Sequence, residues 1–338
     1  MVFTQLNMPS YDFARAKSEY RAFCEAGEHD LPVFAMPWYL DAACAPGEEW
    51  RVILYEEDGA IRAAFPFAYT KRKYGLWRVG NPGWAKRLGI WIDYRDKTRP
   101  SAREAYENKI VEYMVSCLPP YDEFQVQFDA RFQNWQQFHR LGFRQTSYYS
   151  YVMPKDAELE AAIPPQKRKT LRSLEKSFRV GEDIGPEEYA AFFQESYRKR
   201  GRVLSYGMDR FLVLYQAAYA HQAGRLFACR DMVGNLTAVS CVFYDSRRVY
   251  NMFNTFDPTV KNGRALLTLH SMRFARERGL DFDHEGSMIP GVADYNRDFG
   301  SLKEPYFIIT SYSAKYRFLN GLRESAQALG QMARGKGV

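Results

Sequence analysis

Hydrophobic and polar residues alternate along two segments of the chain in a way that predicts β-hairpins. Residues 50–69 read WRVILYEEDGAIRAAFPFAY, with a turn at Asp58-Gly59. Residues 225–244 read RLFACRDMVGNLTAVSCVFY, with a turn at Gly234-Asn235. Alternation on both sides of a glycine-containing pair is typical of two antiparallel strands joined by a tight turn. Each half of the chain is therefore expected to contain one hairpin.

After each hairpin the pattern continues with the same elements in the same order. These are a helix, a short strand, a helical or looped stretch with an aromatic–glycine corner, and a closing strand. In the first half they are residues 103–117, 124–128, 138–143 and 147–153, and in the second they are 264–278, 280–285, 295–300 and 306–312. This correspondence indicates an internal duplication.

A proline and a polar stretch separate the two halves. Pro154 is followed by the polar residues 155–160, which make a plausible boundary. We therefore predict a first domain over 1–153, a second over 154–320 and a tail over 321–338. A short helix from Ala314 to Met332 is expected to pack back on the body.

Composition places the chain among folded proteins. It has 338 residues, of which 46% are hydrophobic and 16% aromatic, and this aromatic content excludes a disordered chain. No apolar run approaches the roughly 20 residues that span a bilayer. Residues 1–20 also lack the apolar core of a signal peptide. We expect a cytoplasmic protein.

Metal binding and disulfide formation have no support in the sequence. The five cysteines form no CxxC pair, and the five histidines are dispersed without an HxH or HExxH spacing. We expect reduced thiols and no metal site.

The repeated order of elements resembles the acyltransferase fold of the GNAT superfamily. In detail the chain resembles its FemAB-like branch, which carries tandem GNAT folds and includes BioF2-like acetyltransferase domains. The segments that carry this resemblance are residues 167–172, 257–267, 282–288 and 299–300. The resemblance implies a mixed α/β fold of two tandem GNAT-like domains, and transfer of an acyl or aminoacyl group to an amine.

Three functions remain open at this stage. The first is an N-acyltransferase that takes its acyl group from an acyl-coenzyme A. The second is a Fem-type enzyme that moves an aminoacyl group from aminoacyl-tRNA to a peptidoglycan precursor, as the resemblance implies. The third is an inactive binding protein that has kept the duplicated fold. The acceptor is a small molecule in the first case and a cell-wall precursor in the second.

A candidate donor loop precedes the helix of the second half. It reads Val260-Lys261-Asn262-Gly263-Arg264-Ala265. Small residues at a helix start let backbone N–H groups close around a pyrophosphate. The corresponding stretch of the first half, residues 95–101, has no glycine, so we expect donor binding in the second half only. Val260 stands where the GNAT pattern has Gln or Arg, which leaves both a different donor and a plain turn open.

Three carboxylates alternate along the predicted strand 280–285. Asp281, Asp283 and Glu285 are expected on one face, about 6–7 Å apart, with His284 on the apolar side as a core residue. Like charges at this spacing raise one another's pKa, which suits a general base. Glu285, nearest the expected cleft, is the first candidate and Asp283 the second. Pairing with basic residues or capping of the following turn is the alternative role for Asp281 and Asp283, and it is the role we expect for Asp281.

Further candidates come from the last strand and from one loop. Lys315 is expected to stabilise an oxyanion, as a late lysine does in the Fem-type relatives, and Tyr312 is expected to protonate a leaving group. Lys303 also qualifies for the role of Lys315. In the loop 80–84, Trp84 is expected to wall an acceptor cleft.

Basic residues concentrate at the start of the second half. Residues 167–179 contain six basic side chains and one acidic one, and the spacing of Leu171, Leu174 and Phe178 predicts an amphipathic helix. We expect this helix and a second cluster to receive phosphates, through Arg168, Arg198, Lys199 and Arg200. A solvated basic face is the alternative.

Overall fold

The computed structural model describes residues 11–27, 29–95, 97–204, 207–260, 263–286 and 288–335, with side chains of the last helix described to residue 326. It divides into two compact units. Unit 1 comprises residues 1–29, 44–147 and 307–338, and unit 2 comprises residues 30–43 and 148–306. The domain division predicted at residue 153 is linear, whereas these units are interleaved along the chain. The linear boundary stays a prediction.

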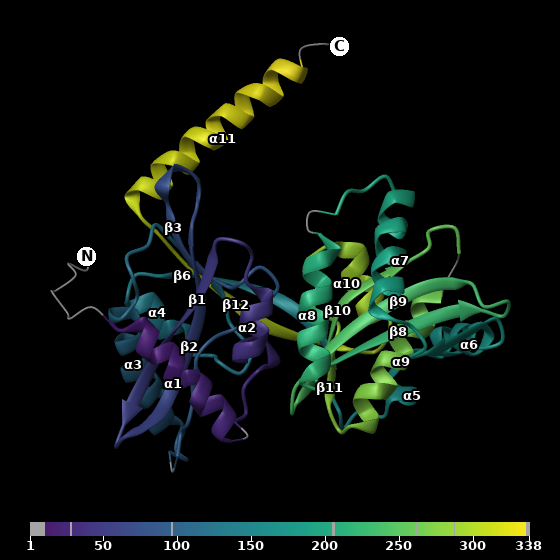
Figure 1. The fold of residues 1–338 in the computed structure, drawn as a ribbon, viewed down its shortest axis with the longest axis horizontal. Coiled ribbons are helices and arrows are strands. Elements are labelled where there is room, and N and C mark those ends of the chain that lie inside the picture. The colour runs from purple at the N-terminus through teal and green to yellow at the C-terminus, as the bar shows by residue number, and fades with distance from the viewer. Residues whose placement is uncertain are drawn as a thin grey trace. The chain divides into compact units, whose positions relative to one another are not determined.

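Unit 1 is built on a sheet with strand order β1-β2-β3-β5-β12. Figure 1 labels β1, β2, β3 and β12. Its elements are α1 (Phe13–Ala26), β1 (Glu48–Glu57), β2 (Ala60–Lys71), η2 (Lys73–Gly75), β3 (Trp77–Gly80), β4 (Trp91–Ile92), α3 (Pro100–Ser116), β5 (Glu123–Gln127), α4 (Trp135–Arg140), the first residues of β6 (Arg144–Met153), the last of β12 (Leu302–Tyr312) and α11 (Ala314–Gly335). Its core includes Phe65, Ile110, Phe124 and Phe138.

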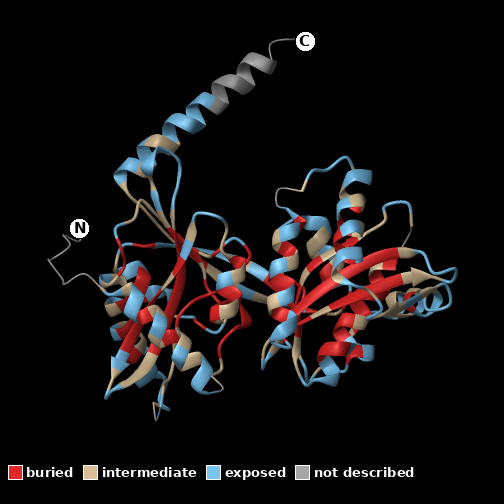
Figure 2. Ribbon diagram, viewed as in Figure 1, coloured by how far each residue is buried: buried red, intermediate tan, exposed pale blue. Residues whose placement is uncertain are grey.

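Unit 2 has the strand order β6-β11-β10-β9-β8-β7. Its elements are η1 (Val33–Ala35), α2 (Pro37–Ala43), α5 (Leu159–Ala162), α6 (Pro165–Leu174), β7 (Phe178–Gly181), α7 (Pro186–Lys199), α8 (Met208–Ala220), β8 (Gly224–Asp231), β9 (Leu236–Tyr244), β10 (Arg248–Phe256), α9 (Gly263–Glu277), β11 (Asp281–Asp283) and α10 (Pro290–Arg297), together with the end of β6 and the start of β12. Figure 2 shows the buried residues on the strands and on α9.

Both units repeat one arrangement, which confirms the mixed α/β expectation. In unit 1 the antiparallel strands β1, β2 and β3 are followed by α3 and by β5, which runs parallel to β3. In unit 2 the antiparallel strands β8, β9 and β10 are followed by α9 and by β11, which runs parallel to β10. The hairpins and central helices lie where the sequence predicts them. The third strand of each set, β3 or β10, is absent from the sequence-based prediction.

The closing strands are exchanged between the two halves of the sequence. Strand β5 of the first half pairs with the end of β12, which closes the second half. Strand β11 of the second half pairs with the end of β6, which closes the first half. Each unit therefore takes its last strand from the other half of the sequence.

Two local expectations are wrong. The basic helix ends at Leu174, and Phe178 begins strand β7 instead of continuing the helical stripe. The last helix begins at Ala314 as predicted, but residues 321–326 are all exposed, so this described part does not pack back on the body. The Phe299-Gly300 corner does form. Gly300 has φ +78°, and a Cβ at this position would collide with the carbonyl oxygen of Ala162.

Candidate functional site

The turn before α9 connects the end of β10 to the predicted donor loop. Oδ1 of Asp257 accepts hydrogen bonds from the backbone N–H and the hydroxyl of Thr259, at 2.9 and 2.6 Å. Nζ of Lys199 lies 2.5 Å from Oδ2 of Asp257. Burial opposes ionisation of Asp257, but the bonds from Lys199 and Thr259 prevail and lower its pKa to about 2. Lys199 is therefore engaged in holding this turn.

The predicted loop residues have different surroundings. Lys261 and Asn262 lie outside the described residues. Gly263 is buried at the start of α9, and a Cβ there would come within 2.9 Å of the Thr237 hydroxyl. Ala265 is buried in the core. Packing therefore explains the glycine at 263, because a residue without a Cβ lets the first turn of α9 lie against the sheet.

Three cationic side chains from three helical segments lie on aromatic rings beside this turn. The guanidinium of Arg264 lies 4.0 Å from the Tyr295 ring centroid, and that of Arg200 lies 4.2 Å from the Phe256 ring. Nζ of Lys167 lies 4.6 Å from the Phe299 ring. We call Lys167, Arg200 and Arg264 the cation cluster.

The side chains of the cation cluster form no ion pair with a carboxylate among the described residues. Burial lowers the pKa of Lys167, Asp298 opposes this effect, and the charge of Arg264 adds to it. Burial also lowers the pKa of Arg200, whose Nε is buried without a hydrogen-bond partner. Excess positive charge at a helix start favours an anionic ligand.

The predicted phosphate-binding residues differ in their contacts. Arg168 donates from Nη1 to the carbonyl of Glu160 at 2.9 Å, and so ties α6 to α5. Arg198 is 75% exposed and pairs with Glu195 at 2.7 Å. Arg200 belongs to the cation cluster, as does Arg264 of the predicted donor loop. Lys167 and the aromatic rings below the cations were missed, because their proximity depends on the tertiary fold.

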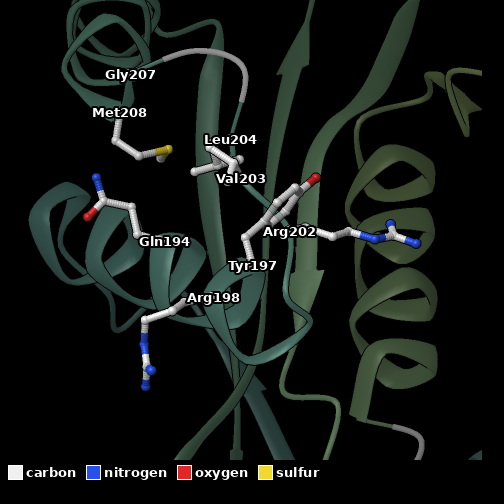
Figure 3. A pocket seen from close by; sticks show the side chains of 8 residues that line it. All are labelled: Gln194, Tyr197, Arg198, Arg202, Val203, Leu204, Gly207 and Met208. Carbon is white, nitrogen blue, oxygen red and sulfur yellow. The ribbon is translucent and has the colours of Figure 1, made fainter.

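A pocket of about 440 Å³ lies beside this region, between α7 and α8. Its lining includes Tyr197, Arg198, Arg202, Leu204 and Met208. In Figure 3 the guanidinium groups of Arg198 and Arg202 point in different directions. Arg202 lies close enough to Arg200 for its charge to act on it, so the pocket adjoins the cation cluster.

The acidic strand forms an ion-pair network, which is the alternative role that the sequence left open for Asp281 and Asp283. Arg248, the first residue of β10, lies 3.1 Å from Asp283, 3.5 Å from Asp281 and 2.6 Å from Glu304. Ser150 of β6 also donates to Asp283, which is fully buried. Burial opposes the charge on Arg248, but Glu304 and Asp283 prevail and raise its pKa. We call Ser150, Arg248, Asp281, Asp283 and Glu304 the arginine network.

Glu285 does not share the face of Asp281 and Asp283, contrary to the expectation from strand alternation. Strand β11 ends at Asp283, and Glu285 has a left-handed φ of +61°. Its side chain is half-buried. Its charge adds to the effect of burial in raising the pKa of Tyr39. The structure thus separates Glu285 from the carboxylates that Arg248 neutralises.

His284 is buried, as expected for a core residue. Its Nε2 lies 3.0 Å from the Ser301 hydroxyl, while its Nδ1 has no hydrogen-bond partner. Burial lowers its pKa to about 3; the charge of Arg264 adds to this and that of Asp283 opposes it. The effect of Arg264 also places the end of β11 near the start of α9.

The depressed pKa of His284 predicts a pH-dependent stability. Above its ordinary pKa of 6.5 the imidazole is neutral in both states, and its stabilising contribution is fully present. Between pH 6.5 and 3 the unfolded chain takes up a proton that the folded chain excludes, so stability falls by about 1.4 kcal/mol per pH unit. Chemical unfolding at pH 7.5 and 5.5 should show this loss in the wild type and a smaller loss in His284→Gln. The exposed-site control His139→Asn should leave the loss unchanged.

The remaining predicted site residues belong to unit 1. Lys315 is exposed and donates to the carbonyl of Gly75 at 3.3 Å. Tyr312 stacks on Tyr316 with ring centroids 4.7 Å apart, and burial raises its pKa. Trp84 is only 7% exposed, and its role at an acceptor cleft stays a prediction. Glu285 and Asp283, by contrast, belong to unit 2.

Metal-binding and membrane-spanning features were sought in the described residues. No group of three or more His, Cys, Asp or Glu side chains there could hold a metal ion. Within the same residues, no helix is both long and apolar enough to cross a bilayer.

Comparison with known proteins places this geometry in context. Residues 166–296 match the family model of the acetyltransferase (GNAT) domain. A search of curated proteins found no match. The solved structure of FemX is 13% identical and has a TM-score of 0.65, over 86% of this chain and 95% of FemX.

Two further solved structures have a similar fold. L-PGS from Bacillus licheniformis is 14% identical, with a TM-score of 0.51 over 90% of this chain and 96% of its own. The C-terminal domain of a putative lysylphosphatidylglycerol synthetase from Agrobacterium fabrum is 13% identical, with a TM-score of 0.51. The match covers 83% of this chain and 88% of that domain. The fold expected from the resemblance to FemAB-like GNAT proteins is confirmed.

Proposed function

We propose that this protein is an N-acyltransferase whose phosphate-bearing donor binds at the start of α9. The match of residues 166–296 to the acetyltransferase (GNAT) family model supports this proposal. The observation that carries it is the cation cluster. Three cations that form no ion pair with a carboxylate among the described residues lie near one helix start, where a pyrophosphate would gain both their charge and the partial charge of the helix.

Acyl-coenzyme A is the donor we favour. Its diphosphate is an anion that the cation cluster could bind, and the GNAT domain match supports a thioester donor. Aminoacyl-tRNA remains the second candidate, because the fold resembles FemX and the resemblance implies such a donor for Fem-type relatives. Both donors carry phosphates, so the cation cluster by itself could bind either one.

The acceptor site is proposed in the pocket between α7 and α8. A volume of about 440 Å³ suits a small molecule or one end of a larger precursor. Arg202, at its edge, has no carboxylate partner among the described residues, which favours an acceptor with an acidic or phosphate group. The adjoining cation cluster would bring this acceptor close to the donor.

In this mechanism Glu285 accepts a proton from the acceptor amine, whose lone pair attacks the donor carbonyl. The N–C bond forms, the C–S bond of the thioester breaks, and coenzyme A leaves as a thiolate that takes up a proton. A protonated amine has no lone pair to attack with, so a nearby carboxylate suits the role of general base. Asp283 is a poor candidate for this step, because Arg248, Ser150 and the backbone N–H of Glu285 occupy its oxygens. Lys315 as oxyanion stabiliser and Tyr312 as proton donor stay predictions.

Ligand binding tests the proposed donor site. Titration calorimetry with coenzyme A, acetyl-coenzyme A and bulk tRNA should detect binding of the first two. Arg264→Ala should weaken coenzyme A binding by about 10- to 100-fold, as expected for a lost charged hydrogen bond. The loss should shrink as salt rises, since salt screens the attraction.

A matched control lies at the other end of the same helix. Arg276 pairs with Glu158 in the last turn of α9, and Arg276→Ala should leave coenzyme A affinity unchanged. Binding of tRNA without coenzyme A would favour the Fem-type reaction. Binding of neither would leave the inactive binding protein as the better interpretation.

A further inference from the structure

The backbone turns sharply where β11 ends. Glu285 and Gly286 have φ of +61° and +45°, both in the left-handed region. A residue other than glycine is uncommon there, because its Cβ crowds the backbone. A Cβ on Gly286 would come within 2.5 Å of the carbonyl oxygen of Tyr149 in β6. Glycine is therefore required at 286, whereas Glu285 adopts its conformation against its own preference.

The side chain of Asp283 binds the backbone of Glu285, the residue with the unfavourable φ. The backbone N–H of Glu285 donates to Oδ1 of Asp283 at 2.8 Å. The same carboxylate accepts from Ser150 of β6 and pairs with Arg248 of β10 at 3.1 Å. Arg248 in turn binds Glu304 of β12 at 2.6 Å. Residues of three other strands thus hold Asp283, two directly and one through Arg248, and Asp283 holds the turn.

The turn decides where the Glu285 side chain goes. In an extended continuation of β11, residue 285 would face the same side as Asp281 and Asp283. Arg248 already faces three carboxylates on that side, Asp281, Asp283 and Glu304. These three carboxylates would repel a fourth one on the same side. The left-handed turn removes Glu285 from this face and leaves it half-buried instead.

We propose that Asp283 is a positioning residue, which uses the arginine network to hold Glu285 in a strained conformation that presents its carboxylate to the acceptor amine. This proposal rests on the proposed role of Glu285 as general base. Strained residues persist where surrounding structure over-determines them, and such strain is concentrated at functional sites.

A double-mutant cycle tests whether Asp283 acts through Glu285. Asp283→Ala and Glu285→Gln should each lower kcat by at least 10-fold with the donor KM nearly unchanged. The double variant should be no slower than Glu285→Gln alone, because Asp283 has nothing left to position. Losses in kcat that multiply in the double variant would overturn the proposal. Asp283→Asn keeps an acceptor for the Glu285 N–H, so its kcat should exceed that of Asp283→Ala. It replaces Asp283→Ala in the cycle if that variant does not fold.

Thermal unfolding tests the strain independently of catalysis. At a left-handed position glycine is preferred over alanine, whereas elsewhere the order is reversed. Glu285→Gly should therefore melt about 2–4 °C above Glu285→Ala. At the exposed helical position 277, Glu277→Gly should melt below Glu277→Ala. If Glu285→Gly melted below Glu285→Ala, as expected at a helical position, the strained turn would be overturned. Full turnover in Glu285→Gln would instead overturn the general-base role of Glu285. The melting temperatures of Glu285→Gly and Glu285→Ala would still decide whether the backbone at 285 is strained.

Discussion

Replacing Glu285 with Gln is expected to lower turnover by about 100-fold or more, with little change in donor affinity. The substitution keeps the shape of the side chain and removes the group that takes the proton from the amine. Loss of a general base lowers kcat and kcat/KM together, because the interaction is made in the transition state. Steady-state kinetics with acetyl-coenzyme A and an amine acceptor, followed by thiol release, measures both quantities.

The controls for this prediction use the same chemical change elsewhere. Glu277→Gln, on the exposed end of α9, should keep full turnover. Calorimetry should give Glu285→Gln a coenzyme A affinity within about 2-fold of the wild type, because the cation cluster is intact. Wild-type turnover in this variant would show that another group, such as a bound water, takes the proton.

Replacing Arg248 with Leu is expected to destabilise the protein by about 3–5 kcal/mol. The change leaves Asp283, which is fully buried, without its cationic partner, and breaking one side of a buried ion pair typically costs this much. Urea unfolding followed by fluorescence should show a lower midpoint. Ser150, Asp283 and Glu304 come from three other strands, so the loss should affect the packing of all of them.

Two comparisons separate this effect from a general cost of losing an arginine. Arg297→Leu removes an exposed pair with Asp294, with side chains 61% and 59% exposed, and should cost about 0.5 kcal/mol or less. Adding Asp283→Asn to Arg248→Leu should recover part of the lost stability, since it removes the uncompensated charge. An Arg248→Leu variant as stable as the wild type would contradict the network's role.

Local patterns in the sequence were sufficient to predict much of the secondary structure. The hairpins around Asp58-Gly59 and Gly234-Asn235, the helices α3 and α9, and the Phe299-Gly300 corner all depend on residues close together in the chain. Side-chain alternation, helical spacing and glycine conformation are set by neighbouring residues, so a single sequence records them. The repetition of these patterns was also sufficient to predict the duplicated mixed α/β architecture.

Only the tertiary structure decided which strands pair and which charges meet. The exchange of β6 and β12 depends on pairings between residues more than 100 positions apart, which no local pattern encodes. Asp283 was expected to share a catalytic role, but Arg248, on a strand the sequence did not reveal, neutralises it. Glu285 leaves the strand face in a left-handed turn, in which its own backbone N–H donates to Asp283 of that network. Lys167, Arg200 and Arg264 form one cluster because α6, α7 and α9 meet at the end of β10. The sequence by itself thus determined the elements and the candidate residue types, whereas long-range packing and charge pairing determined which of them can act together.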